Sequence, residues 1–257
     1  MTQPLLELRG VNKSFGVVHV LHDVDFAVYP GQVTALVGDN GAGKSTLVKI
    51  IAGIYGRDSG DYVFEGQPVA VHGPRDVAAL GVEVVYQDLA LCDNLDIVEN
   101  MFLGREETKG LALDEVTMEA RARETLASLS VRTVKSVRQS VSSLSGGQRQ
   151  TVAIAKAVLW NSKVVLLDEP TAALGVAQTR QVLDLVRRLA DQGLGVVLIS
   201  HNMTDVFEVA DRITALYLGR VAADVPAKDL THSQVVELIT AGRSGDLGIT
   251  NVATATI

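Results

Sequence analysis

The chain has 257 residues, 47% of them hydrophobic, enough for one sizeable core in a single domain or a domain with a subdomain. Its net charge of −7 disfavours nucleic-acid binding, which needs a basic face. The single cysteine, Cys92, excludes an intrachain disulfide and fits a reducing compartment. No run approaches the ~20 apolar residues that span a bilayer, and residues 1–9 lack the pattern of a signal peptide. We therefore expect a cytoplasmic protein, which can still dock on a membrane partner.

The first third of the chain reads as strands, a glycine-rich loop and helices. The apolar run at 33–37 fits a parallel strand that is covered on both faces. It ends at Gly38, and a strand further on ends at Gln87. The predicted elements are strands at 5–9, 24–29 and 33–37, a helix at 44–52, a hairpin at 61–71, a helix at 74–80 and a strand at 82–86.

Residues 88–160 contain little strand signal and read as a helical insertion, with helices at 114–130 and 145–160. Strands and helices alternate again after it: a strand at 163–167, a helix at 175–191, a strand at 195–200, a helix at 203–209 and a strand at 213–218. This alternation indicates an α/β fold with a mostly parallel sheet.

These elements predict one domain over residues 1–241, with a core formed by 1–87 and 161–222 and a helical subdomain at 88–160. Residues 242–257, rich in Gly, Thr, Ala and Ser, are predicted to form a flexible tail. The polar residues of interest follow predicted strands, where open α/β sheets bind ligands: Gly38, Gln87, Asp168, Glu169 and His201.

A phosphate-binding loop is predicted at Gly38-Asp39-Asn40-Gly41-Ala42-Gly43-Lys44-Ser45, which matches G-x-x-x-x-G-K-[ST] between a strand and a helix. Its glycines let backbone N–H groups wrap phosphates, and the helix directs its positive end at the same anion. Lys44 supplies a charge to the phosphates, and Ser45 offers a hydroxyl to magnesium. The alternative is an ordinary glycine-rich turn.

An acidic pair, Asp168 and Glu169, follows the apolar strand at 163–167. We expect Asp168 to hold magnesium through water and Glu169 to polarise an attacking water. The alternative is two solvated carboxylates at the end of a strand.

A second short motif, Leu144-Ser145-Gly146-Gly147-Gln148, allows two interpretations. Ser145 and Gln148 form a capping box that would start a helix with no further function. Glycine inside a helix costs ~1 kcal/mol relative to alanine, so two glycines favour a site where a phosphate approaches the first turn closely.

In combination, these motifs resemble the ATP-binding cassette (ABC) superfamily. The resemblance covers roughly residues 5–220 and rests on Gly38–Ser45, Gln87, Leu144–Gln148, Leu166-Leu167-Asp168-Glu169-Pro170 and His201. It implies the ABC ATPase fold: a P-loop NTPase core of RecA type with a mostly parallel sheet, an N-terminal antiparallel β-subdomain and an inserted helical subdomain.

The resemblance also implies an ATPase that uses ATP and Mg²⁺. Gln87 would reach the magnesium and the attacking water, His201 would contact the γ-phosphate, and Phe15 would stack on adenine. The alternatives are a structural histidine and a core phenylalanine. The implied catalytic residues are Glu169, His201, Lys44 and Gln87, and the implied magnesium site uses Ser45, Gln87 and Asp168. The implied nucleotide contacts are Phe15, Gly38, Asp39, Asn40, Gly41, Ala42, Gly43, Lys44, Ser45, Thr46, Ser145, Gly146, Gly147 and Gln148.

In this superfamily two cassettes pair head to tail, and the signature helix of one caps the ATP bound by the other. A second such subunit is therefore an implied partner, and a monomer should be nearly inactive. One departure is Gly175, where the superfamily commonly has an aspartate that crosses the dimer interface.

Three stretches resemble the ATPase subunits of bacterial monosaccharide importers of the ribose, xylose and fructose type, in their single-cassette form. They are residues 38–47, 99–106 and 168–175. This resemblance implies a subunit bound to the inner face of the membrane through a permease that docks near residues 88–106. A separate binding protein would recognise the sugar, and no nucleic acid is expected.

Three alternatives remain open: an exporter subunit, a ribosome-associated ATPase and a DNA-repair or chromosome ATPase. The second class usually carries two cassettes and a basic linker. In the third class a long coiled coil separates the phosphate loop from the signature motif. Here residues 46–143 separate the two motifs, and they are too few for such a coiled coil and lack heptads.

Overall fold

The computed structural model describes residues 3–131 and 134–248. Its centre is a six-stranded sheet in the order β12-β11-β3-β10-β9-β6. All neighbouring strands in it are parallel except β12, which pairs antiparallel with β11. The strands are β3 (Val33–Gly38), β6 (Val82–Val85), β9 (Val164–Asp168), β10 (Gly195–Ile199), β11 (Arg212–Tyr217) and β12 (Arg220–Pro226).

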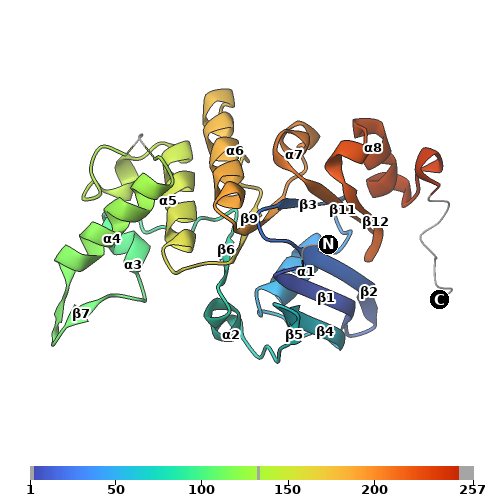
Figure 1. Ribbon diagram of the computed structural model, residues 1–257, viewed down its shortest axis with the longest axis horizontal. Coiled ribbons are helices and arrows are strands. Elements are labelled where there is room, and N and C mark those ends of the chain that lie inside the picture. The colour runs from blue at the N-terminus through green and yellow to red at the C-terminus, as the bar shows by residue number, and fades with distance from the viewer. Residues whose placement is uncertain (1–2, 132–133, 249–257) are drawn as a thin grey trace.

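Helices and a second sheet cover the two faces of this sheet, so its central strands are buried. Every residue of β10 is buried, which is why its sequence, Gly195-Val196-Val197-Leu198-Ile199, is apolar throughout. In Figure 1, α6 (Val176–Asp191), α7 (Met203–Val209) and α8 (His232–Ala241) lie above the sheet, and α1 (Lys44–Ile51) lies below it with the N-terminal strands. The predicted α/β fold with a mostly parallel sheet is confirmed.

The N-terminal sheet is antiparallel, in the order β2-β1-β4-β5. Its strands are β1 (Leu6–Phe15), β2 (Val18–Val28), β4 (Ser59–Phe64) and β5 (Gln67–Pro68), and α2 (Pro74–Ala79) follows it. The first two strands are longer than the predicted 5–9 and 24–29. In their outer halves, register shifts interrupt the pairing, so buried and exposed side chains do not alternate regularly. A strand is predicted from an alternation of apolar and polar residues, and that pattern is weak here.

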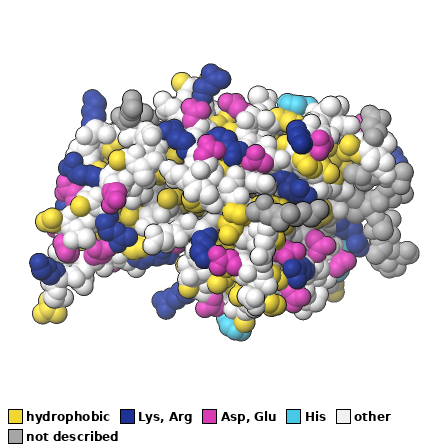
Figure 2. All heavy atoms as spheres, in the orientation of Figure 1, with side chains coloured by type: hydrophobic (Ala, Val, Ile, Leu, Met, Phe, Trp, Pro, Cys, Tyr) yellow, Lys and Arg dark blue, Asp and Glu magenta, His cyan; other side chains and the backbone are white. Residues whose placement is uncertain are grey.

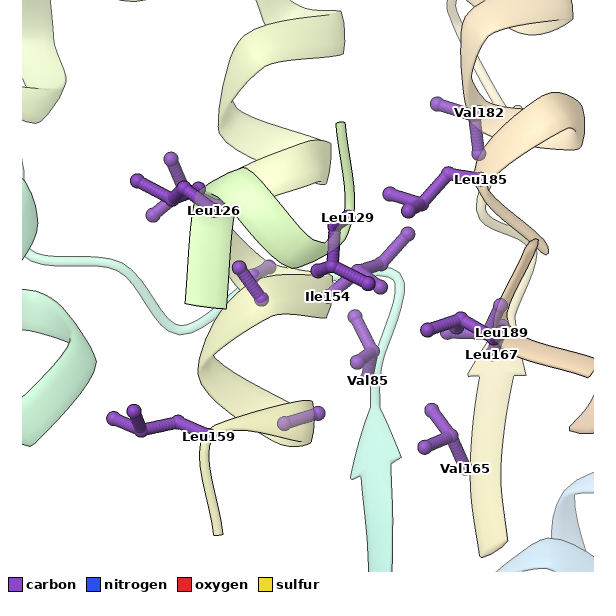
Figure 3. Packing of buried hydrophobic residues seen from close by; sticks show 14 of the residues in the cluster. Val85, Leu126, Leu129, Ile154, Leu159, Val165, Leu167, Val182, Leu185 and Leu189 are labelled. Atoms are coloured by element: carbon purple, nitrogen blue, oxygen red, sulfur yellow. The ribbon is translucent and has the colours of Figure 1, made fainter. Parts of the chain in front are cut away.

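The described residues of the segment 88–160 form three α-helices, α3 (Ile97–Phe102), α4 (Glu115–Ser128) and α5 (Gly146–Val158), and the 3-10 turn Val141–Ser143. These helices share a continuous apolar cluster with the central sheet and α6. Figure 3 shows Leu129 and Ile154 of this segment beside Val85 of β6 and Leu185 of α6. Each is 5% exposed or less, and burying a side chain of this size stabilises a fold by ~1.5–3 kcal/mol.

Besides α3 and the edge strand β12, two further parts of the fold have no counterpart in the predicted elements. A short ribbon, β7 (Thr108–Lys109) with β8 (Ala112–Leu113), interrupts the helical segment, and its turn exposes Leu111 fully. Hydrophobic side chains lie over this ribbon at the lower left of Figure 2. The other is α8, which packs on β11.

Part of the predicted tail at 242–257 is described. It contains the 3-10 turn Gly245–Leu247, and the Ser244 side chain is buried. Residues 249–257 lie outside the described part of the chain. Within the described ranges, no helix is both long enough and apolar enough to cross a membrane.

Candidate active site

A cavity of about 560 Å³ lies at the carboxyl ends of the central strands. It brings together the four residues implied to be catalytic, Lys44, Gln87, Glu169 and His201, with the start of the phosphate loop. The lining residues are Gly38, Asp39, Asn40, Lys44, Gln87, Glu169, Ala172, His201, Met203 and Ile239. Residues separated by more than 150 positions in the sequence therefore meet at one edge of the sheet, as the strand order predicts.

The loop between β3 and α1 has the geometry of an anion cradle. Gly43 adopts φ 104°, and a Cβ there would lie 2.7 Å from Leu21 Cδ2, so no other residue fits without a shift. The N–H of Ala42 donates to the carbonyl of Asp39 at 3.1 Å, which closes the turn. Ser45 and Thr46 follow in the first turn of α1, where the helix end favours negative charge.

Lys44 folds back over this loop. Its Nζ donates to the carbonyls of Gly38 at 2.6 Å and Asp39 at 3.0 Å. Partial burial lowers the pKa of the Lys44 ammonium, while the nearby Glu169 carboxylate opposes that shift. A cation held by two carbonyls in this way can transfer to phosphate oxygens, which are the stronger acceptors.

The two carboxylates after β9 have different surroundings. Asp168 ends the strand, and burial raises the pKa of its carboxyl, with the neighbouring negative charge of Glu169 adding to the shift. Glu169 adopts φ 49°, which turns its side chain into the cavity, and its Oε2 lies 2.8 Å from His201 Nδ1. Neither is a freely solvated carboxylate, because Asp168 is partly buried and the Glu169 side chain is only 17% exposed.

Phe15 lies at the end of β1 and is 43% exposed, so it is not a core residue. One edge of its ring meets Tyr55, with centroids 5.1 Å apart and planes at 70°. Lys13 Nζ lies 5.3 Å from the Phe15 centroid. An exposed aromatic ring supported from one side can stack on a planar ligand.

The signature segment begins α5 as a complete capping box. Ser145 N–H donates to Gln148 Oε1 at 2.9 Å, and Gln148 N–H donates to Ser145 Oγ at 3.4 Å. Gly147 is buried, and a Cβ there would lie 3.0 Å from Gln178 Cβ on α6. Packing against α6 therefore explains why residue 147 is glycine. The argument that a phosphate must approach the backbone closely applies only to the exposed Gly146.

Within one chain, this segment does not meet the phosphate loop. Ser145, Gly146, Gly147 and Gln148 do not line the cavity of about 560 Å³. Figure 1 shows α5 on the far side of α6 from α1. Phe15 also lies outside this cavity lining. So do Gly41, Ala42, Gly43, Ser45, Thr46 and Asp168, each of which lies within two positions of a lining residue along the chain.

Sequence reasoning missed three lining residues: Ala172, Met203 and Ile239. Ile239 comes from α8, whose start carries a detectable signal. Thr231 and Gln234 form a capping box, with Thr231 N–H donating to Gln234 Oε1 at 2.8 Å. The T-x-x-Q spacing before an apolar run could have predicted this helix.

Gly175 is the N-cap of α6, and its conformation does not require glycine. Its φ of −74° is ordinary, and a Cβ there would meet nothing within 4 Å. We expect Gly175→Asp to raise the free energy of unfolding by a few tenths of a kcal/mol, because the carboxylate can accept from first-turn N–H groups that have no side-chain cap. Urea denaturation of wild type, Gly175→Asp and Gly175→Ala measures this. Alanine, which cannot cap, should be the least stable of the three, and an aspartate variant below alanine would contradict the expectation.

The chain matches known proteins over most of its length. The ABC transporter family profile matches residues 21–172. The fructose import ATP-binding protein FrcA of Rhizobium meliloti is 46% identical over 248 residues, covering 94% of this chain and 95% of that protein. The xylose/arabinose import ATP-binding protein XylG of Sulfolobus acidocaldarius is 45% identical, with 95% and 97% covered. The ribose import ATP-binding protein RbsA 1 of Rubrobacter xylanophilus is 41% identical, but this chain spans only 47% of its length.

Solved structures agree with this assignment. A nucleotide-free ATP-binding cassette from an ABC transporter superposes with a TM-score of 0.78 at 25% identity, covering 87% of this chain and 92% of that one. The cbiO1 protein of Clostridium perfringens, part of the ABC transporter complex cbiONQ, gives the same score and identity with 95% and 98% covered. The chain therefore belongs to the ABC transporter family, as an ATPase with the ABC ATPase fold.

Proposed function

We propose that this ATPase energises the import of a monosaccharide through a membrane permease. The ATPase activity in this proposal rests on the cavity that Lys44, Glu169 and His201 line together. The sugar part is supported by the fructose, xylose/arabinose and ribose import proteins that the chain resembles.

In this proposal the phosphate loop binds the β- and γ-phosphates of ATP through its backbone N–H groups, and Lys44 exchanges its two carbonyl contacts for phosphate oxygens. Phe15 stacks on the adenine. Glu169 accepts the proton of the attacking water, and His201, held at 2.8 Å by Glu169, orients toward the γ-phosphate.

A magnesium ion fits the residues present. Asp168 and Glu169 are neighbouring carboxylates whose negative charges repel each other. A cation between them and the phosphates would offset the rise in the Asp168 pKa. Magnesium prefers one or two protein oxygens together with phosphates and water. Ser45 and Gln87 would supply those oxygens, Asp168 would hold the ion through water, and the ion would neutralise charge on the phosphates.

The signature segment acts, in this proposal, on ATP bound to a second copy of the chain. Ser145 and Gly146 are exposed and do not line the cavity that contains the chain's own phosphate loop, so a partner can reach them. A bacterial ABC transporter cassette with the same fold has been described as dimeric. A two-fold pair of this kind contains two composite sites.

The permease would dock in a groove of about 290 Å³ beside β6. Its lining includes Leu103, Arg105, Lys156 and Trp160, which fall in and beside the predicted docking segment at 88–106. Arg105 pairs with Glu83 at 2.7 Å and lies 5.3 Å from the Trp160 ring centroid. The groove has an apolar floor, acidic side chains at Glu83 and Asp88 and basic ones at Arg105 and Lys156. It suits an amphipathic cytoplasmic segment that places a carboxylate near Lys156. Through this contact the ATPase would sit at the cytoplasmic face of the membrane, with a sugar-binding protein on the other side.

The ATPase part is tested with purified protein. ATP hydrolysis that requires magnesium and disappears in Lys44→Ala would support it, and absence of hydrolysis at high protein concentration would count against it. The sugar part is tested by uptake of radiolabelled fructose, xylose, arabinose and ribose in cells with and without the gene. Unchanged uptake of all four sugars would contradict a monosaccharide cargo.

The docking groove gives a separate prediction. Burial lowers the pKa of the Lys156 ammonium, and reversing its charge in Lys156→Glu should repel a partner carboxylate. We expect permease-dependent transport to fall about ten-fold, while the isolated subunit keeps its affinity for ATP, because loss of one interfacial charge pair costs ~1.5 kcal/mol or more. Lys228→Glu, an exposed reversal outside the groove, is the matched control. Equal transport by both variants would remove Lys156 from the interface.

A further inference from the structure

Asp205, on the first turn of α7, is the only buried Asp or Glu in the described part of the chain, at 5% exposure. Its Oδ2 accepts from Thr171 Oγ1 at 2.7 Å, and its Oδ1 accepts from Asn202 Nδ2 at 3.0 Å. A buried carboxylate is costly unless donors satisfy it, so these two bonds fix its orientation. The side chain thus connects two loops, where a simple helix cap would bond only within its own turn.

Each of the two loops carries one member of the active-site pair. Thr171 follows Glu169 by two positions, and Asn202 directly follows His201. The pair itself closes at 2.8 Å between Glu169 Oε2 and His201 Nδ1. The loops are therefore joined twice, once through the pair in the cavity and once through Asp205, which does not line the cavity.

The positions of Glu169 and His201 both depend on how the surrounding structure holds their backbone. Glu169 adopts φ 49°, a conformation that non-glycine residues keep only when the surrounding structure holds it. The His201 side chain is 76% exposed, so its position depends on the loop that carries it. That loop is held by Asn202, whose N–H donates to Ser200 Oγ at 3.0 Å and whose amide reaches Asp205.

We propose that Asp205 is a positioning residue that keeps Glu169 and His201 in contact by joining Thr171 to Asn202. The role rests on the proposed ATPase function of the cavity. Asp205 does not line that cavity, so it acts through the pair and not on the nucleotide.

Substitutions at Thr171 test the link. Thr171→Val removes the donor and keeps the shape, and we expect kcat to fall about ten-fold with KM for ATP changed less than about two-fold, because a small displacement of the reacting groups lowers turnover more than binding. Thr171→Ser keeps the donor and should stay within about two-fold of wild type. Thr214→Val is the matched control, since Thr214 Oγ1 also donates to an aspartate, Asp224 at 3.0 Å, on strands away from the cavity.

A double-mutant cycle separates positioning from general destabilisation. In a His201→Ala background, Thr171→Val should change kcat by less than about two-fold, because the contact that it supports no longer exists. The imidazole NMR resonances of His201 give a readout without turnover, and they should shift in Thr171→Val but not in Thr171→Ser or Thr214→Val. Asp205→Asn should reproduce the Thr171→Val pattern.

Wild-type kcat and unshifted His201 resonances in a folded Thr171→Val variant would overturn the proposal. So would equal losses in both backgrounds, or a serine variant as impaired as the valine variant. A wild-type protein without ATPase activity would overturn the proposed function, and the His201 resonances would still decide the role of Asp205.

Discussion

Replacing Glu169 with glutamine should reduce ATP turnover by ~10²-fold or more and leave ATP binding intact. The amide keeps the size of the side chain and loses the base that accepts a proton from water. It also loses the charge that faces His201 Nδ1 at 2.8 Å. Steady-state hydrolysis and equilibrium binding of a fluorescent ATP analogue measure the two effects separately.

Glu208→Gln is the matched control for this variant. Glu208 is an exposed glutamate on α7 whose ion-pair partner, Arg180, lies 4.0 Å away outside the cavity. It should keep wild-type turnover, because exposed pairs of this kind contribute little. Near-normal turnover in Glu169→Gln would remove Glu169 from the role of base.

Mixing two inactive variants should restore activity. Lys44→Ala lacks a working phosphate loop, and Ser145→Arg blocks the exposed start of α5, so each homodimer has no complete site. In an equal mixture, half of the dimers are mixed, and each of these keeps one complete site out of two. Independent sites would therefore recover about one quarter of wild-type activity.

The control for this experiment is a mixture of Lys44→Ala with the Lys44→Ala, Ser145→Arg double variant. Its mixed dimers contain no intact phosphate loop and should stay inactive. Circular dichroism should show that Ser145→Arg is folded, since the substitution also removes a helix cap. Full activity of Ser145→Arg alone would contradict a site shared between two chains.

The parts of the fold that were predictable from sequence are those with local signals. The apolar runs at β3, β9 and β10 match buried parallel strands to within a residue or so, because strands covered on both faces carry few polar side chains. The phosphate loop was equally clear, since its pattern specifies backbone geometry, and Gly43 adopts the positive φ that the pattern implies.

The parts that were not predictable depend on contacts between distant segments. The ribbon β7–β8 has only two residues in each strand, which is too short for a periodic signal. The role of Gly147 depends on Gln178 of α6, and the link through Asp205 depends on Thr171, 34 positions away. The paired glycines of the signature therefore looked wholly functional from sequence, although packing explains one of them.

Because the helical segment and the sheet share one apolar cluster, substitutions in the helical segment can reduce activity in a mutational screen by destabilising the whole domain. Leu167 belongs to this cluster and directly precedes Asp168 on β9, while Leu126 of α4 and Leu129, the C-cap residue of that helix, enter the same cluster. Removing a buried leucine from α4 costs ~2–5 kcal/mol, a large share of the stability of a domain. Such a substitution lowers the population of folded chains and with it the ATPase rate in the cell, although it touches neither nucleotide nor permease. Loss of function at α4 therefore reports abundance first, and docking residues are identified among variants whose cellular levels match wild type.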